Sequence, residues 1–125
     1  MFIHFNPNPI HESAEDCVVR AFCKVLNLPW EEAYLQLCMK GLEMYNWGNS
    51  NAVWGALLHD KGFKRGIIPN TCPDCFTVKD FCREYPTGVY VLGTGTHAVA
   101  VVDGDYFDTW DSGDLVPIYS YRKEQ

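Results

Sequence analysis

A histidine and an aspartate lie close together across a predicted β-hairpin in the C-terminal half of the chain. The stretch HAVAVVDGDYFDTW, residues 97–110, carries apolar residues on both sides of Asp103-Gly104, the pattern of a two-residue type I′ turn. The resulting register places Asp108 diagonal to His97 and within reach of its ring. A carboxylate there fixes the tautomer of an imidazole and stabilises the imidazolium. The pair therefore predicts a group that exchanges protons.

Two neighbouring residues bear on this interpretation. Trp110 is expected directly opposite His97, where its indole would shield the pair from water. A hairpin loop of odd length would shift the register by one residue and bring Asp111 into the place of Asp108. In the alternative interpretation His97 is an ordinary strand-end histidine and Asp108 a turn carboxylate, and neither has a chemical role.

A cysteine near the front of the chain is the candidate nucleophile. The segment ESAEDCVVRAF places Cys17 at the N-terminal end of an apolar-striped helix. Exposed backbone N–H groups and the positive end of the helix favour a thiolate there, and a nearby imidazolium favours it further. Asp16 opposes this effect unless its side chain is bonded elsewhere. The alternative for Cys17 is a buried helix cysteine, a common fate of free cysteines.

The order of these residues resembles the papain-like cysteine peptidase superfamily. DCVVRAF is similar to its nucleophile helix, and HAVAVV followed by DTW is similar to its paired strands. The compact size resembles the bacterial peptidase C39-like branch and small phage-encoded relatives. The resemblance implies a papain-like fold, with Cys17 as nucleophile, His97 as general base and then acid, and Asp108 orienting His97. It further implies hydrolysis of a peptide, isopeptide or amide bond through a thioester, without a cofactor or metal.

One position departs from the superfamily pattern. The superfamily usually has a glutamine six residues before its cysteine, which donates to the oxyanion, and His11 stands there in this chain. A histidine N–H can serve as such a donor, alongside the backbone N–H of Cys17. Asn6 or Asn8 could take the role instead, and His11 would then be a solvated loop residue.

Helical patterns occupy most of the first half of the chain. The first helix has an apolar stripe at i, i+3, i+4 and i+7, with Ser13 or Asp16 as its cap and an end at 27–29. Cys23 and Cys38 are expected to pack inside helices, and Cys82 in the core. The stripe is Val18, Ala21, Phe22 and Val25; the buried face of the second helix is Trp30, Ala33, Tyr34 and Leu37; the later helices span 29–45, 51–61 and 77–85.

Strand patterns dominate the second half. Besides the two hairpin arms, strands are expected at 88–92, 116–121 and 63–68, and Pro117 places its strand at an edge. Helices followed by a mostly antiparallel sheet indicate an α+β fold. The length of 125 residues predicts one domain over 1–125.

The amino-acid composition argues against some classes of binding partner. A net charge of −6 argues against nucleic-acid binding, which needs basic surface, while 47% hydrophobic residues favour a packed core. No signal peptide or membrane-spanning run is evident, so we expect a cytoplasmic protein whose six cysteines are thiols. The expected partner is a protein or peptide substrate, and the oligomeric state is open. A second hypothesis is a weakly catalytic papain-like relative that binds a partner protein.

The motif Cys72-Pro73-Asp74-Cys75 offers a rival chemistry. A Cys-x-x-Cys between a strand and a helix is typical of thiol–disulfide oxidoreductases, although the long helical segment before it does not suit that fold. A zinc site would need further ligands such as Cys82 or His59, which the spacing does not require. We therefore interpret the motif as a turn that carries two thiols.

Overall fold

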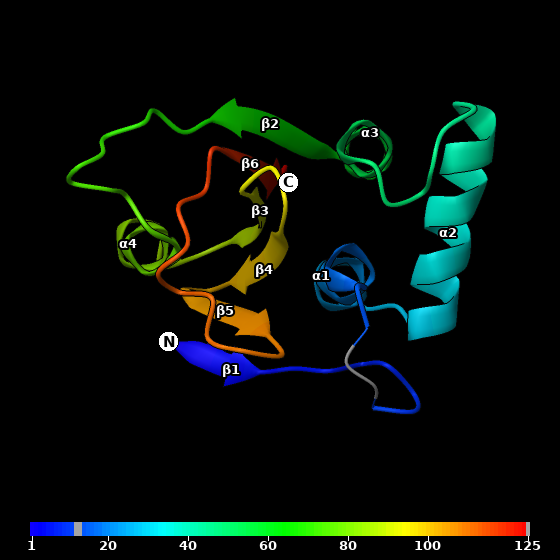
Figure 1. Ribbon diagram of the computed structural model, residues 1–125, viewed down its shortest axis with the longest axis horizontal. Helices are drawn as coiled ribbons and strands as arrows, with labels where there is room; N and C mark the ends of the chain where they lie inside the picture. Colours follow the sequence, from blue (N-terminus) through cyan, green and yellow to red (C-terminus); the bar gives the residue numbers. More distant parts are fainter. Residues whose placement is uncertain (12–13, 125) are drawn as a thin grey trace.

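The computed structural model of the chain describes residues 1–11 and 14–124, and these form an α+β fold in which helices flank one mixed sheet (Figure 1). The helices are α1 (Cys17–Leu26), α2 (Trp30–Glu43), α3 (Asn51–Asp60) and α4 (Val78–Glu84). The strands are β1 (Phe2–His4), β2 (Phe63–Ile67), β3 (Val89–Gly93), β4 (Ala98–Val102), β5 (Asp105–Asp108) and β6 (Tyr119–Lys123).

The sheet has the order β1-β5-β4-β3-β6-β2, and every neighbouring pair is antiparallel except β1 and β5. The predicted hairpin is confirmed, because Val101 pairs with Tyr106 and both turn residues, Asp103 and Gly104, have positive φ. The predicted edge strand was wrong: β6 lies between β3 and β2. Pro117 precedes that strand, so its missing N–H does not interrupt the ladder.

Helix α1 packs against one face of the sheet, over strands β4 and β5. The four residues of its predicted stripe are all buried, as expected for an amphipathic helix. Ala98 and Ala100 of β4 belong to the same core cluster. Small side chains let a helix lie close to the strand beneath it, and this brings the first turn of α1 near the start of β4.

Helix α4 covers the opposite face, so the sheet lies between α1 and α4 (Figure 1). Phe81 of α4 packs with Tyr90, Val99 and Val101 in a second core cluster. Thr77 caps the helix through a reciprocal pair of bonds with Asp80, as the sequence predicted for the cap position. The β4 strand therefore alternates between two cores, which fixes its register.

Helices α1 and α2 differ from the sequence predictions in detail. Asp16 occupies the cap position of α1, but its side chain makes no capping bond, and Ser13 lies outside the described residues. In α2 the predicted burial holds for Ala33 and Leu37, whereas Tyr34 is 47% exposed. Cys38 is exposed instead of packed, because α2 covers the core with only one side.

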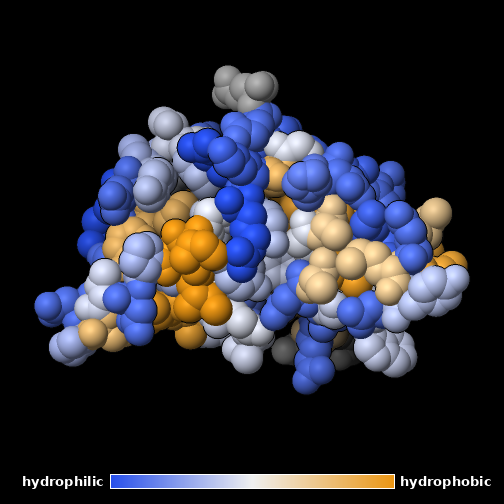
Figure 2. All heavy atoms as spheres, turned by 90° about the horizontal axis from the view of Figure 1, so that it is seen from above, coloured by the Kyte–Doolittle hydropathy of each residue, from blue (hydrophilic) through white to orange (hydrophobic). Residues whose placement is uncertain are grey.

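The outer edge of the sheet at β2 is partly apolar. Figure 2 looks from above onto the side of the molecule that carries β2, and it shows apolar atoms gathered between hydrophilic ones. Ile67, the last residue of β2, is 67% exposed.

Among the described residues no helix is long and apolar enough to cross a membrane.

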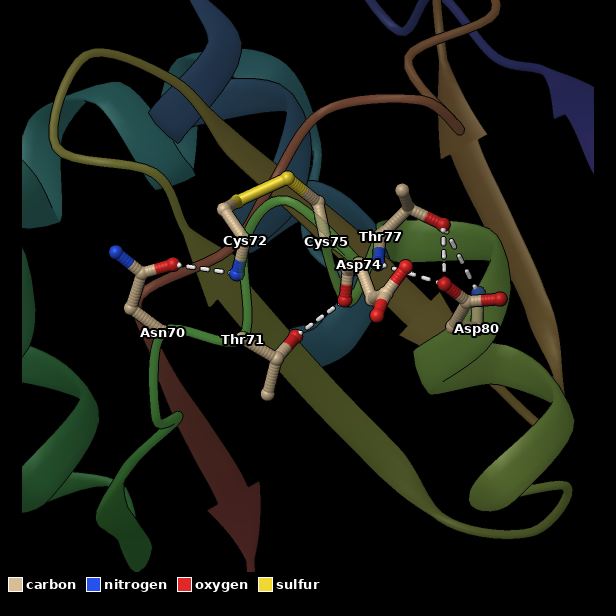
Figure 3. Close-up of a disulfide and its surroundings, with 7 residues drawn as sticks. All are labelled: Asn70, Thr71, Cys72, Asp74, Cys75, Thr77 and Asp80. Carbon is tan, nitrogen blue, oxygen red and sulfur yellow. Dashed lines mark hydrogen bonds between the residues drawn. A yellow bond between two sulfur atoms is a disulfide. The ribbon is translucent and has the colours of Figure 1, made fainter.

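The cysteines are not all free, which corrects the expectation of six thiols. Cys72 and Cys75 form a disulfide in the loop between β2 and α4 (Figure 3). That loop is braced by hydrogen bonds that the backbone N–H of Cys72 and the hydroxyl of Thr71 donate to neighbouring oxygens. Cys23 and Cys82 are free and buried, as predicted.

Candidate active site

Cys17 and His97 meet at the junction of α1 and the sheet. Cys17 is the first residue of α1 and is half-buried, while His97 directly precedes β4. Their side chains lie close enough to influence each other's pKa, and the influence favours the thiolate of Cys17 and the imidazolium of His97. Both line a pocket of about 260 Å³, together with Asn51 and Thr96. The sulfur is therefore beside the imidazole and at the wall of an open pocket.

The turn between β3 and β4 holds His97 in place. The hydroxyl oxygen of Thr94 accepts the backbone N–H of His97 at 3.1 Å, and the N–H of Thr94 donates to the His97 carbonyl at 3.0 Å. The side-chain amide of Asn51 donates to the carbonyl of Gly95 at 3.0 Å. This last bond ties the turn to the start of α3, so the turn and α3 together hold the backbone that carries the imidazole.

Asp108, the last residue of β5, is the partner of His97. Its Oδ2 atom accepts from His97 Nε2 at 2.7 Å and from the Ser112 hydroxyl at 2.8 Å. Its Oδ1 atom accepts from Arg20 at 3.0 Å and from the backbone N–H of Thr109 at 2.8 Å. The side chain is only 1% exposed. With four donors around it, the carboxylate is held in a single orientation.

Arg20 connects this carboxylate to a second one. It lies one helical turn after Asp16 and pairs with Asp16 and Asp108 at once, and all three side chains are buried. The indole N–H of Trp30 also donates to Asp16, at 2.9 Å. The charge of Asp16 is thereby engaged by an adjacent cation, which removes the objection that it would oppose a thiolate at Cys17.

These contacts shift the pKa of the Cys17 thiol. Burial alone would raise it, but the hydrogen bond to His97 and a backbone hydrogen bond from Ala98 outweigh burial, and the charges of His97 and Arg20 add to them. The net result is a Cys17 pKa below the ordinary value of 9.0. In contrast, burial together with the charge of Asp16 raises the pKa of Cys23 to about 11. Only Cys17 is thus activated in α1.

The pKa values of His97 and Asp108 shift in the directions that favour the charged form of each group. Burial alone would lower the pKa of His97, but the hydrogen bonds to Asp108 and Cys17 overcome it and raise the pKa of His97 to about 9. Burial works against the charged form of Asp108 too, yet the hydrogen bonds from His97 and Ser112 leave its pKa below 3.8. All three shifts favour the charged forms, a thiolate at Cys17, an imidazolium at His97 and a carboxylate at Asp108.

Trp110 lies against His97, and Asp111 does not. The ring centroids of His97 and Trp110 are 5.3 Å apart, although the indole remains 48% exposed and covers the imidazole only in part. Asp111 accepts hydrogen bonds from the Tyr106 hydroxyl and from the backbone N–H of Gly113. The even-length loop therefore selects Asp108, as the two-residue turn requires.

The residues considered as oxyanion donors lie in other surroundings. His11 is exposed, and it is not among the residues that line the pocket of Cys17. Asn8 is buried, and its side chain bonds the backbone N–H of Ile10 and the carboxylate of Asp16. The pocket wall contains a different amide, Asn49, whose side chain accepts or donates no hydrogen bond within the described residues.

Arg20, Ser112 and Thr94 are the supporting residues that the sequence interpretation did not include. Arg20 carried a recognisable signal, because it is a charged residue inside an apolar helix and follows Asp16 by four positions. Ser112 and Thr94 carried none, since loop geometry alone brings them to Asp108 and His97. Within residues 1–11 and 14–124 no cluster of three or more metal-ligating side chains occurs.

Comparison with protein-family models, curated proteins and solved structures found no match.

Proposed function

We propose that this chain is a thiol hydrolase with a papain-like arrangement, in which Cys17, His97 and Asp108 act as a catalytic triad on a peptide, isopeptide or amide bond. The observation that supports it most is the placement of Cys17 and His97 on the wall of one pocket, with His97 hydrogen-bonded to the buried Asp108 at 2.7 Å. Such a chain is the means by which enzymes activate a thiol and return its proton to a leaving group.

The first step is acyl transfer to the sulfur. The Cys17 thiolate attacks the carbonyl carbon of the bound substrate, and the carbonyl electrons move to oxygen. His97 then gives its proton to the departing amine as the C–N bond breaks, which leaves a thioester on Cys17. Because Nε2 is bonded to Asp108, Nδ1 is the nitrogen left to exchange the proton.

The second step returns the enzyme to its starting state. Neutral His97 takes a proton from water, the hydroxide attacks the thioester carbonyl, and the C–S bond breaks to give a carboxylic acid and the Cys17 thiolate. The oxyanion in both steps needs donors at the start of α1. We assign the backbone N–H of Cys17, which has no partner within a helix at this position, and the amide of Asn49 on the pocket wall.

Thiol–disulfide exchange at Cys72 and Cys75 is the second candidate, and the disulfide itself favours it. Both cysteines lie in a loop, however, and α4 begins only at Val78. The backbone N–H groups that lower the pKa of a redox cysteine at a helix start are therefore not adjacent to either sulfur. The hydrolase proposal explains the buried hydrogen bonds around His97 and Asp108, whereas thiol–disulfide exchange explains only the disulfide.

Acylation by an activated ester tests the proposal. We expect p-nitrophenyl acetate to transfer its acetyl group to Cys17, detected on the tryptic peptide by mass spectrometry, with nitrophenolate released in a burst. The His97→Ala variant should acylate more slowly by about 10²-fold, the usual contribution of a general base. Acetylation of Cys17 no faster than that of exposed Cys38, and unchanged in His97→Ala, would contradict the hydrolase and support a binding protein.

A further inference from the structure

An apolar groove runs along the helical side of the molecule beside the candidate active site. Its volume is about 690 Å³, and the first turn of α1, α2 and the loop from α2 to α3 line it. Val19, Trp30, Tyr34 and Leu37 form much of its wall. This volume lies in the range of sites that bind small ligands or several side chains.

The groove adjoins the pocket that holds Cys17. Asn49 and Ser50 line both spaces, and the groove also contains Asp16, the residue that precedes Cys17. A substrate chain with its carbonyl at the Cys17 sulfur would therefore have the groove beside it. This adjacency sets which part of the substrate the groove can contact, namely the residue next to the bond that is cleaved.

Contacts within the protein hold the part of the groove wall that α2 and the adjoining loop form. The rings of Trp30 and Tyr34 stack with centroids 5.1 Å apart and planes 11° apart, and Asp16 holds the indole N–H of Trp30. Glycines bring the loop onto α2: a Cβ on Gly48 would meet the Leu37 carbonyl oxygen at 2.8 Å. A wall held in this way favours binding because little side-chain freedom is lost.

The charges around the groove restrict its occupant. Among the described residues, those that line it include the carboxylates of Glu15 and Asp16 and no lysine or arginine. An acidic side chain would find no cation there, and Glu15 would repel it. Exposed Trp47, 83% accessible at the mouth, instead offers a large aromatic surface to an apolar group.

We propose that this groove is the specificity site of the enzyme and binds a large apolar or aromatic side chain next to the scissile bond. The inference rests on the proposed thiol hydrolase activity, since it is Cys17 that places the substrate. The expected order of preference is phenylalanine or leucine first, lysine next and aspartate last. The loop from α2 to α3 would then select substrates, while α1 and the sheet supply the chemistry.

Peptidyl chloromethyl ketones test the site without a known substrate. The Cys17 thiolate displaces chloride from the probe, and mass spectrometry of the Cys17 peptide gives the rate. We compare acetyl-X chloromethyl ketones, in which the carbonyl of residue X itself carries the chloromethyl group and X is phenylalanine, leucine, lysine or aspartate. The phenylalanine probe should react at least about tenfold faster than the aspartate probe, the discrimination expected of one apolar pocket.

Matched variants assign this preference to the groove. Trp47→Ala and Tyr34→Ala should each slow the phenylalanine probe by about tenfold. Leu35→Ala on the same helix and Tyr45→Asn in the same loop remove exposed apolar side chains outside the groove, and they should not change the rate. Asparagine suits the positive φ of 53° at Tyr45.

Iodoacetamide, which is too small to need the groove, separates the two proposals. If iodoacetamide labels Cys17 rapidly and His97 is required, but all four ketones react equally, the groove proposal is overturned and the hydrolase stands. If iodoacetamide labelling of Cys17 is slow and independent of His97, the hydrolase fails first. Equal slowing of both reagents by Trp47→Ala would also overturn the groove proposal, because it would indicate a general distortion.

Discussion

His97 Nε2 lies 2.7 Å from Asp108 Oδ2, across the ends of two neighbouring antiparallel strands. The contact follows from strand register, because the two-residue turn at Asp103 and Gly104 sets which residues of β4 and β5 face each other. A single inserted residue in that turn would move the carboxylate away from the imidazole. The chemistry of the site is in this sense a consequence of hairpin geometry.

Removing the charge of Asp108 should uncouple the triad. In Asp108→Asn the carboxylate that holds the His97 pKa near 9 is lost, so the imidazole becomes neutral at lower pH and stabilises the Cys17 thiolate less. We expect acylation of Cys17 to fall by about 10²-fold or more. Asp111→Asn is the matched control, since Asp111 bonds Tyr106 and not His97. An equal fall in the rate of Cys17 acylation in both variants would argue against Asp108 as the partner of His97.

Arg20 should be essential to the stability of the fold. Its guanidinium neutralises two buried carboxylates, and Arg20→Met leaves Asp16 and Asp108 without that cation. Loss of one member of a buried ion pair costs about 3–5 kcal/mol of unfolding free energy. Urea unfolding at pH 7 measures it. Arg83→Met, which breaks an exposed pair with Asp80, is the control and should leave the midpoint unchanged. Similar midpoints for both variants would refute the role of Arg20.

Stability should depend on pH through His97. The folded-state pKa of about 9 lies above the ordinary value of 6.5, so protonation favours the folded state. His97 therefore adds stability that is complete below pH 6.5 and is lost as the pH rises through about 9. The difference in unfolding free energy between the wild type and His97→Gln should shrink over this window. A difference that grows with rising pH would contradict the shift.

The disulfide should be separable from the hydrolytic site. Cys72 and Cys75 lie in the loop that leads to α4, on the side of the sheet away from α1. The double variant Cys72→Ser, Cys75→Ser should therefore acylate Cys17 at the wild-type rate. The oxidoreductase alternative gives a different result, because Cys72→Ser alone would then abolish reduction of a disulfide substrate while Cys17→Ser would not.

The oxyanion assignment distinguishes His11 from Asn49. Asn49→Ala should lower the turnover of an ester or amide substrate by about 10²-fold, the usual effect of losing one oxyanion donor. His11→Ala should have no effect, since His11 does not line the pocket that contains Cys17. Steady-state kinetics of the two variants decide between them, and a loss confined to His11→Ala would restore the interpretation made from the sequence.

Local patterns predicted the elements well and their arrangement less well. The stripe of α1, the cap at Thr77 and the hairpin register could be predicted because each depends on residues close in sequence. Strand β1 was missed, since three residues carry no detectable periodicity and its pairing with β5 is tertiary. The position of β6 inside the sheet depends on long-range pairing in the same way.

For the candidate site, the sequence supplied the chemical groups but not their supports. The residues Cys17, His97 and Asp108 could be predicted from helix-start and hairpin patterns, and the structure brings them together. The disulfide was predicted wrongly because composition and an expected compartment do not determine whether two nearby sulfurs pair. Asn49 was not identified, since only the folded loop between α2 and α3 brings it to the pocket.

The pH dependence of Cys17 alkylation reports whether His97 activates the thiol. The rate with iodoacetamide, measured on the Cys17 peptide in the wild type and in His97→Ala, reports the thiolate fraction. We expect the wild-type thiol to ionise with a pKa below its ordinary value of 9.0, and the midpoint of the rate to move to higher pH in His97→Ala. The same midpoint in both proteins, at or above 9.0, would contradict it.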